Sequence, residues 1–549
     1  MSDSIRSLKT ERGFSRRELG RKAGLVALGG ALPWGRLSAV DGAPAGLQGS
    51  PGVSPGIYES LGVRPFINCR GTITVLGGSI ELPEVAAAKT LANRQHVQLD
   101  ELMEAAGKRL AELTGAEWGM VSAGCAAAMS HATAACVAGG NPDLHVRIPD
   151  LSGFPRDEVI IPSDSRNSYD PAIRAVGVRI IEVDTPEELR LAIGPRTAMI
   201  YVVSNSRNES GTMSVEAIAQ MARPHDIPLL VDAAPEILTI PNVHLQRGAT
   251  LVAYSGGKVI RGPQSAGLLL GRKDLVKAAW VHSAPHHGYA RSMKVGREEV
   301  VGMLAALESW VKRDHDAEWK EWVARCDYIA ERVSRIPGVT TSVRREPGGR
   351  GNRSPRISIR WDSQQLGVTG REVTEILDTT EPRIVLGGGG GGAGVGQDAA
   401  GDTGISLTAF MMSPGDEKIV AERVHQVLSA PRTPRPVEAP RPPSGNLSGH
   451  WKVDIQFAAS RSRHTLDLVQ DGGRLQGTHQ GDFRARELNG TIEGDSVTFV
   501  TRPARSRGDN LTFRFTGTLG GNSMSGELDM GEYLSASWTA QRHVSNRSL

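Results

Sequence analysis

The residue of this sequence that most clearly invites chemistry is a lysine on a glycine-rich turn. Lys258 lies in residues 254–271 (YSGGKVIRGPQSAGLLLG), between two short apolar runs bounded by glycine, as buried strands are. A lysine held in apolar surroundings loses its proton more easily and can attack a carbonyl. Pyridoxal 5'-phosphate (PLP), which joins a lysine as a Schiff base, is the cofactor that this chemistry suggests. A solvated surface lysine is the alternative.

An acid that could serve the same cofactor lies upstream. Residues 227–232 form an apolar run that ends in Asp232. An aspartate at the carboxyl end of a buried parallel strand faces the crevice in which α/β sheets bind ligands. There it would keep the PLP ring nitrogen protonated, so that the ring can accept electrons. The alternative is an aspartate that caps the following helix.

A candidate phosphate cradle lies further upstream, in residues 118–129 (WGMVSAGCAAAM). A short apolar strand passes through small residues into an alanine-rich helix, which gives the helix N-terminus free N–H groups and the positive end of its dipole. The cradle would comprise Ser122, Ala123, Gly124, Cys125 and Ala126. Ser255 could add a hydroxyl to the same phosphate. An ordinary strand–helix turn with a serine cap is the alternative.

The order of cradle, acid and lysine, together with several separate strings, resembles the fold-type-I PLP enzymes. The closest resemblance is to the selenocysteine synthase and D-glucosaminate-6-phosphate ammonia-lyase-like group, and it runs from Tyr58 to Val427. The strings are SGGKVIRGPQS (255–265), INCRGT (67–72), GGS (77–79), SRNSYD (165–170) and MKVGREE (293–299). The resemblance implies that Lys258 carries PLP as an aldimine, that Asp232 pairs with the ring nitrogen, and that residues 122–126 hold the phosphate.

The resemblance implies an enzyme that acts on an amino acid or amino-sugar acid, with α,β-elimination of the ammonia-lyase type favoured. Selenium transfer, aminotransfer and a non-catalytic binding protein with the same fold are alternatives. Relatives carry histidine where this chain has Ser165, which could change the reaction. The resemblance also implies a homodimer or larger homo-oligomer.

Polar residues after other strands are candidate substrate contacts. Asn205 and Arg207 follow an apolar run at residues 200–203, where a substrate or the cofactor oxygen O3′ would lie. Arg166, Arg261 and Arg297 could grip a carboxylate or phosphate with their guanidinium groups. A solvated loop and surface ion pairs are the alternatives.

Composition argues against several other classes of function. The 549 residues carry a net charge of +3, which gives no strong nucleic-acid footprint, so no nucleic-acid partner is expected beside the small-molecule amino substrate. The four cysteines have no metal-ligand spacing. Just past the lysine region lie His282, His286 and His287. A histidine pair could bind a metal, but no third ligand follows at a suitable spacing, so we expect these residues to form a loop over the active site rather than a metal site.

The N-terminus predicts export rather than fold. Arg16 and Arg17 precede a mildly apolar run at residues 23–32, and small residues follow at 43–45. This pattern indicates a twin-arginine signal, which moves folded proteins to the periplasm or outside the cell. The apolar run is too short to span a bilayer, so no transmembrane segment is expected. A basic amphipathic helix and an uncleaved anchor are the alternatives.

Alternating strand and helix patterns over residues 118–271 predict a doubly wound, mostly parallel sheet of the aminotransferase type, followed by a small α/β subdomain. After a proline-rich stretch, eight short runs alternate with period two, which predicts an antiparallel barrel or sandwich. The glycine run after Leu386 lacks P-loop context and is expected to be a loop. The expected divisions are a signal (1–45), a PLP-binding domain (46–300), a small subdomain (301–430), a linker (431–445) and a β domain (446–549).

Overall fold

The computed structural model describes residues 56–346, 348–351, 353–387, 404–434, 440–503 and 511–543. The predicted export signal, most of the glycine run and part of the proline-rich linker therefore lie outside the described residues. Residues 56–63 contain one short helix, α2 (Ile57–Ser60). The chain from Arg64 onward forms a separate unit.

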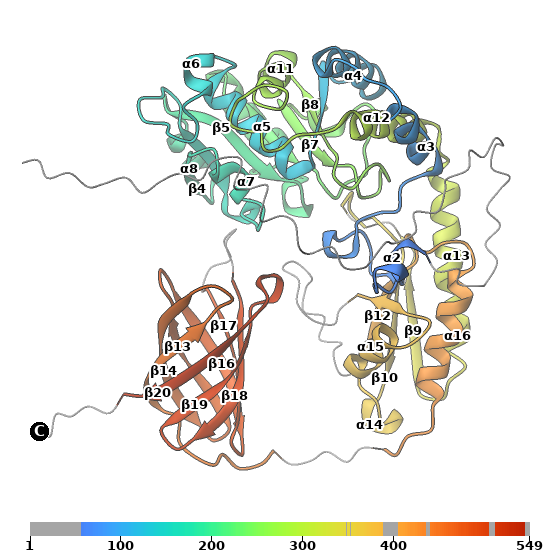
Figure 1. Ribbon diagram of the computed structural model, residues 1–549, viewed down its shortest axis with the longest axis vertical. Helices are drawn as coiled ribbons and strands as arrows, with labels where there is room; N and C mark the ends of the chain where they lie inside the picture. Colours follow the sequence, from blue (N-terminus) through green and yellow to red (C-terminus); the bar gives the residue numbers. More distant parts are fainter. Residues whose placement is uncertain are drawn as a thin grey trace, which may run out of the picture. The chain divides into compact units, whose positions relative to one another are not determined.

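A seven-stranded sheet organises the larger α/β part, in the order β2-β8-β7-β6-β5-β3-β4 (Figure 1). β3 to β7 pair in parallel, whereas β8 runs antiparallel to both β7 and β2. The carboxyl ends of β2, β5, β6 and β7 therefore share one edge of the sheet. The strands are β2 (Trp118–Ser122), β3 (Glu158–Pro162), β4 (Arg179–Val183), β5 (Thr197–Val203), β6 (Leu229–Asp232), β7 (Leu251–Ser255) and β8 (Gly267–Gly271).

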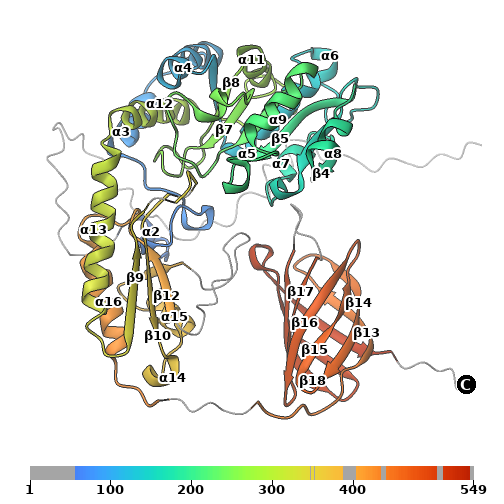
Figure 2. The ribbon, with the colours of Figure 1, turned by 180° about the vertical axis from the view of Figure 1, so that it is seen from behind.

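Helices cover both faces of this sheet, with α5 in front in Figure 1 and α9 in front in Figure 2. α5 packs across β5, β6, β7 and β8 and is itself covered by α11 and α7. α4 and α12 pack beside β2. The helices are α3 (Pro83–Ala92), α4 (Leu99–Thr114), α5 (Cys125–Ala138), α6 (Pro142–His145), α7 (Pro171–Arg174), α8 (Pro186–Ala192), α9 (Val215–Ala222), α10 (Val243–Gln246), α11 (Lys273–Val281) and α12 (Arg297–Lys312).

Local sequence explains where these elements begin. Every residue of β6 is buried, as expected for a central parallel strand whose two faces are both covered. α9 starts at Ser214, whose hydroxyl accepts from the Ala217 N–H, and α8 starts in the same way at Thr185. α5, in contrast, begins at Gly124 with no side-chain cap, a difference that matters for the site below.

The small subdomain has its own core and its own sheet. β9 (Val339–Arg344), β10 (Arg356–Trp361) and β12 (Gly404–Thr408) form an antiparallel sheet in the order β12-β10-β9. α13 (His315–Val333) packs on β9 and β10 and against α16 (Asp416–Ser429). The remaining elements are α14 (Ser363–Leu366), α15 (Gly370–Thr379), and a parallel pair of β1 (Ile67–Cys69) and β11 (Ile384–Leu386).

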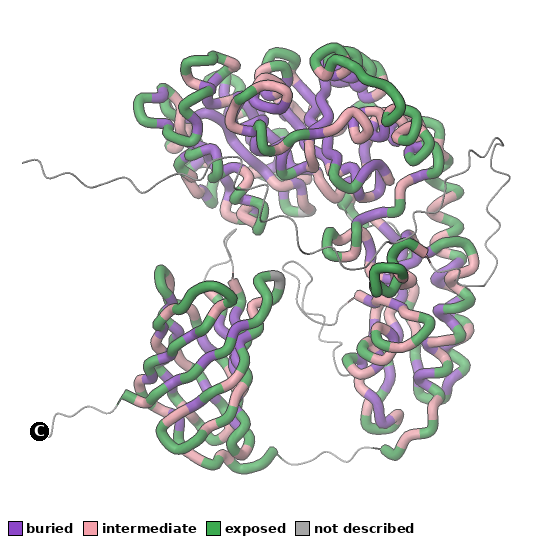
Figure 3. Tube along the Cα trace, in the orientation of Figure 1, coloured by how far each residue is buried: buried purple, intermediate pink, exposed green. Residues whose placement is uncertain are grey.

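The C-terminal strands form a closed, eight-stranded antiparallel barrel, so a barrel is correct and a sandwich is not. Buried and exposed residues alternate along its strands (Figure 3). Trp451, Phe499, Phe515 and Trp538 fill its interior. The strands are β13 (Gly449–Gln456), β14 (Arg461–Asp471), β15 (Arg474–Gln480), β16 (Ala485–Glu493), β17 (Ser496–Arg502), β18 (Phe513–Gly520), β19 (Ser523–Asp529) and β20 (Ser535–Arg542). The predicted fold class is confirmed.

Candidate active site

Asp232 ends β6 at the sheet edge, and its carboxylate is held by three donors. The Ala234 N–H donates to Oδ1 at 2.9 Å, the Tyr201 hydroxyl donates to Oδ2 at 3.1 Å, and the Cys125 thiol lies 3.6 Å from Oδ1. The aspartate is almost fully buried. Because the backbone donor is two residues on, the carboxylate stabilises its own turn and does not cap a helix.

Lys258 lies on the turn that joins β7 to β8. The Arg261 N–H donates to the Lys258 carbonyl at 2.9 Å, and the Gly256 N–H donates to the Ala266 carbonyl at 2.8 Å. A Cβ on Gly257 would stand 2.7 Å from the Gln264 Cα, so this tight turn requires glycine there. Burial lowers the pKa of Lys258, and the nearby Cys125 and Asp232 act against that shift. An amine of lowered pKa is a better nucleophile at neutral pH.

The N-terminus of α5 reaches the same place from β2. Gly124 has φ of +91°, and a Cβ added there would meet no heavy atom within 4 Å. A Cβ on Gly267 would stand 2.6 Å from the Cys125 nitrogen, so glycine lets β8 approach the start of α5. The Ser122 hydroxyl donates to the Gly124 carbonyl at 2.9 Å and shapes this turn. The first turn of α5 therefore has N–H groups without a side-chain cap, and there is free space beside Gly124.

The N-terminal segment adds a serine to the lysine turn. The Ser79 N–H donates to the Gly257 carbonyl at 2.9 Å. The Ser79 hydroxyl is buried and, among the described residues, has no hydrogen-bond partner. A buried hydroxyl without a partner is costly, so its presence beside Lys258 points to a ligand atom there.

These residues fit PLP. An uncapped helix N-terminus suits a phosphate dianion, a carboxylate held by three donors suits the ring nitrogen, and a lysine of lowered pKa suits the aldehyde. Burial raises the pKa of Asp232, and the Ala234 N–H, the Lys258 charge, the Tyr201 hydroxyl and the Cys125 thiol all oppose that rise. The site therefore contains the groups that keep an enclosed carboxylate ionised.

Comparison with known proteins places the chain in a family. The Aminotransferase class-V model matches residues 171–347. The D-glucosaminate-6-phosphate ammonia lyase of Salmonella typhimurium is 32% identical over 330 residues, which cover 58% of this chain and 86% of that protein. The chain belongs to the class-V aminotransferase family. It is thus a PLP-dependent lyase or transferase.

Two further similarities support the class-V assignment. The 5'-C-glycyluridine monooxygenase-decarboxylase of a Streptomyces species is 35% identical over 388 residues, covering 68% of this chain and 92% of that protein. A solved structure of a D-glucosaminate-6-phosphate ammonia-lyase superimposes with a TM-score of 0.60 at 29% identity, covering 68% of this chain and 99% of that chain. The predicted resemblance to the ammonia-lyase group is confirmed.

Other predicted contacts of this class-V enzyme lie around the same sheet edge. Asn205 follows β5, where its side chain donates to the Val203 carbonyl at 3.1 Å and accepts from the Arg207 N–H at 2.8 Å. It thereby caps the short 3-10 helix η3 (Ser206–Asn208). Arg207 is exposed.

Ser255 is the last residue of β7, three positions before Lys258. Ala123 and Ala126 flank Gly124 and Cys125 at the start of α5. Cofactor or substrate contacts by these residues remain predictions.

The three remaining arginine candidates all have protein partners. Arg166 is almost buried and pairs with Asp170 and, at 2.7 Å, with Glu182. Arg261 donates to the Ile80 carbonyl at 3.1 Å, and burial together with Arg313 lowers the pKa of its guanidinium. Arg297 starts α12 and donates to the Ala92 carbonyl at 3.1 Å, which ties α12 to the end of α3. Their role in substrate binding remains a prediction.

The histidines after the lysine turn make contacts with residues other than Lys258 and Asp232. His282 is buried at the end of α11 and stacks on His145, with ring centroids 4.4 Å apart. His286 lies 3.2 Å from Asp100. His287 is exposed. Within the described ranges, no three histidine, cysteine or acidic residues are grouped as metal ligands. None of the described helices is long and apolar enough to cross a bilayer.

Sequence reasoning missed Tyr201 and Asn167 as members of the site. Tyr201 lies inside an apolar strand and resembles an ordinary core residue. The signal available was the register: Val203 pairs with Asp232 across β5 and β6, so Tyr201 lies on the neighbouring strand two residues before the sheet edge. A tyrosine buried there needs a polar partner for its hydroxyl.

Proposed function

We propose that this chain binds PLP at Lys258 and catalyses an α,β-elimination that releases ammonia from an amino acid or amino-sugar acid. One observation carries the proposal. Lys258, Asp232 and the uncapped start of α5 come from three distant stretches of sequence, yet meet at one edge of one sheet. The ammonia-lyase relative supports the reaction type.

Each group has a defined task in this proposal. The N–H groups at the start of α5 would hold the cofactor phosphate, and Asp232 would face the ring nitrogen as an anion. Bound PLP would make the bonds at the substrate's α-carbon labile by withdrawing electrons into its ring. Lys258 Nζ, with its lowered pKa, would accept the α-proton and deliver it as needed.

The net chemistry balances without an oxidant. The substrate loses its α-proton and a β-hydroxyl as water, and water returns when ammonia leaves. The products are a keto acid and ammonia, which together contain all the atoms of the substrate. A substrate with both an α-amino group and a β-hydroxyl is therefore required.

The test uses the purified full-length protein. Borohydride reduction followed by mass spectrometry should find a pyridoxyl group on the Lys258 peptide, and amino-sugar acids should release ammonia and keto acid in equal amounts. Lys258→Ala should lose the visible cofactor band and reduce turnover by at least about a thousandfold. Lys273→Ala, at the exposed start of α11, is the matched control and should change neither. Label on another lysine, or none, would contradict the proposal.

A second candidate reaction is favoured by the 35% identical monooxygenase-decarboxylase. In that case the enzyme would consume oxygen and release carbon dioxide from an amino acid. The same substrate panel, run with and without oxygen, separates the two: elimination continues without oxygen, whereas oxidative decarboxylation stops.

We also propose export and assembly from the sequence. The Arg16–Arg17 pair supports a twin-arginine route to the periplasm or beyond. Changing both to lysine should leave precursor in the cytoplasm, and unchanged export would refute the route. The family resemblance supports a homodimer or larger homo-oligomer, which light scattering of the full chain would test.

A further inference from the structure

Asp232 is fixed from the neighbouring strand by a chain of two hydrogen bonds. Tyr201 lies on β5 and is fully buried, and its hydroxyl donates to Asp232 Oδ2 at 3.1 Å. Asn167, from the loop before α7, donates from Nδ2 to the same hydroxyl oxygen at 3.2 Å. The three side chains thus connect two strands and a loop that are far apart in sequence.

The direction of this chain is set by the asparagine. Asn167 Oδ1 accepts from the Tyr169 N–H at 2.7 Å, and Nδ2 also donates to the Ser165 carbonyl at 3.0 Å. These contacts fix which end of the amide faces Tyr201. Because Nδ2 can only donate, the Tyr201 oxygen must accept from it, and the single hydroxyl proton is directed at Asp232.

We propose that Asn167 and Tyr201 are positioning residues for the cofactor acid: they fix the rotation of the Asp232 carboxylate and keep it ionised opposite the PLP ring nitrogen. The inference rests on the proposed function and assigns residues to it. Neither residue reaches the reacting carbon in this assignment, since both act through Asp232.

The electrostatics agree with this geometry. Burial raises the pKa of Asp232, and Tyr201 is one of four groups that oppose the rise, with Ala234, Lys258 and Cys125. Burial and the Asp232 charge raise the pKa of Tyr201, so its hydroxyl stays protonated and remains a donor. Removing the hydroxyl should therefore raise the pKa of Asp232 further and leave less anion at neutral pH.

The chain offers a matched control on the adjacent strand. Tyr254, on β7, is also fully buried, and its hydroxyl accepts from Asn242 Nδ2 at 2.7 Å. It has no contact with Asp232 among the hydrogen bonds of the described residues. Tyr254→Phe therefore removes the same atom from the same sheet without touching the cofactor acid.

The experiment titrates apo-protein with PLP from acid to neutral pH. In wild-type protein, affinity should fall at acid pH as Asp232 becomes protonated. Tyr201→Phe should weaken PLP binding about tenfold at neutral pH. It should also move the acid limb of the affinity profile, the pH range over which PLP affinity falls, to higher pH by about one unit. Both are the effect of one lost hydrogen bond to a charged group. Tyr254→Phe should leave both unchanged.

Asn167→Ala provides a second variant that keeps the hydroxyl but frees its direction. It should move the acid limb in the same sense by a smaller amount, and it should add nothing in a Tyr201→Phe background, because its effect passes through Tyr201. Circular dichroism verifies that each variant folds. If the effects of Asn167→Ala and Tyr201→Phe are additive, the proposed relay, in which Asn167 acts on Asp232 through Tyr201, is wrong.

The outcomes are distinguishable. If wild-type protein binds no PLP, the proposed function falls and this inference falls with it. If wild-type protein binds PLP but Tyr201→Phe keeps its affinity and acid limb, only the relay is wrong. A shift in Tyr254→Phe as large as that in Tyr201→Phe would also overturn it, because the effect would then follow from any lost tyrosine hydroxyl.

Discussion

Two clusters of buried polar side chains in this chain have opposite designs. In the α/β part, Asp232, Tyr201 and Asn167 gather at a sheet edge, next to a helix whose first N–H groups have no side-chain cap. In the barrel, His464 Nδ1 and His479 Nε2 lie 2.8 Å apart, and His479 Nδ1 lies 3.0 Å from the Thr501 hydroxyl. The first cluster lies at the carboxyl edge of a parallel sheet beside the candidate cofactor lysine, whereas the second lies among aromatic rings inside the barrel.

The difference follows from the two backbones. A parallel sheet ends all its strands at one edge, where side chains of several strands converge on a space that no strand fills. A small closed barrel points its alternate residues inward and fills its interior with them. Phe513 and Phe515 pack against His479, and the ring centroids of His479 and Phe515 are 5.4 Å apart in an edge-to-face arrangement. The barrel cluster therefore stabilises a fold, while the sheet cluster positions chemistry.

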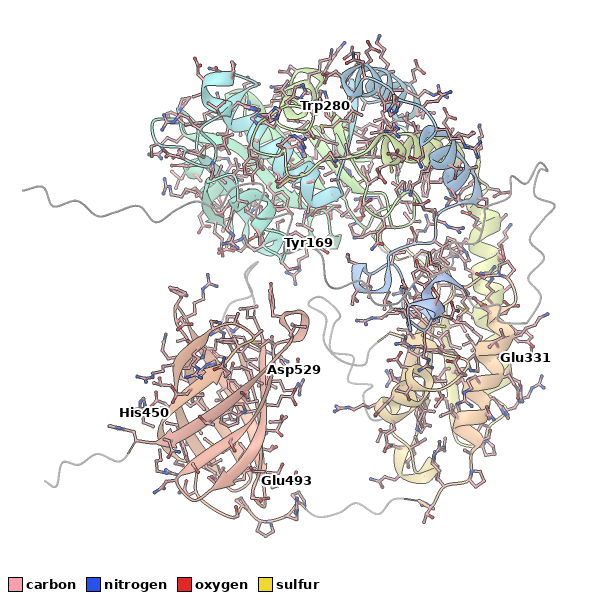
Figure 4. All side chains as sticks on the ribbon, in the orientation of Figure 1. Tyr169, Trp280, Glu331, His450, Glu493 and Asp529 are labelled. Atoms are coloured by element: carbon pink, nitrogen blue, oxygen red, sulfur yellow. The ribbon has the colours of Figure 1, made fainter. Side chains whose placement is uncertain are left out.

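The barrel ends also differ from each other. Its turns at one end have two residues each, with glycine at positive φ in each turn: Gly472, Gly494 and Gly521. The other end has longer loops that carry the exposed side chains of Phe483, Tyr533 and Leu534. In Figure 4, Glu493 lies at the end with the two-residue turns, and Asp529 lies at the end with the longer loops. Core and surface of the barrel can thus be perturbed separately.

The larger effect is expected from the barrel core. Trp538 is buried, and its indole N–H donates to the Glu527 carbonyl at 3.1 Å. Trp538→Ala should lower the free energy of unfolding of the barrel by about 3–5 kcal/mol, through the lost packing and the cavity left behind. Urea-dependent oxidation of the buried Met524 measures this in the full chain, and Met199 in β5 reports the sheet.

The comparison predicts that the sheet reporter and PLP affinity stay unchanged in that variant. Phe483→Ala, at a position 96% exposed, is the matched aromatic control and should alter the barrel's stability by no more than about 0.5 kcal/mol. Loss of PLP binding in Trp538→Ala would show that barrel and active site are not independent.

The sequence reveals these two regions to different degrees. All eight barrel strands follow from period-two alternation, because each strand has one face inside and one outside. Lys258, Asp232 and the start of α5 are also predictable, since each has a local signature of strand, turn and small residues. Tyr201 is not, because its partner comes from a different strand and only the register brings them together. The ion-pair alternative for Arg166 also has a local signature, an acid four residues on at Asp170.

The last prediction concerns pH and the barrel histidines, and its observable is a change of slope rather than a loss of stability at one pH. Burial, with His464 and Arg486 nearby, lowers the pKa of His479 from its ordinary 6.5 to about 3, and burial lowers the pKa of His464 despite Asp482. Between pH 6.5 and about pH 3, the unfolded chain binds a proton at His479 that the folded barrel excludes. Barrel stability should therefore be highest above about pH 6.5 and fall as the pH drops, and His479 contributes a slope of up to about 1.4 kcal/mol per pH unit between pH 6.5 and its lowered pKa.

His479→Gln should make that decline shallower, because glutamine does not titrate and only His464 then excludes a proton in the folded barrel. His543→Gln, at an exposed histidine beyond β20, is the control and should leave the slope unchanged. The measurement is the urea midpoint of Met524 oxidation in the full chain between pH 7 and about pH 4. His131 and His282, buried in the α/β part, have pKa values lowered to about 4 and about 3, so the Met199 reporter in the sheet should show a decline of its own. His479→Gln should leave that decline unchanged, and a change in the Met199 slope in this variant would mean that the barrel and the sheet are not independent.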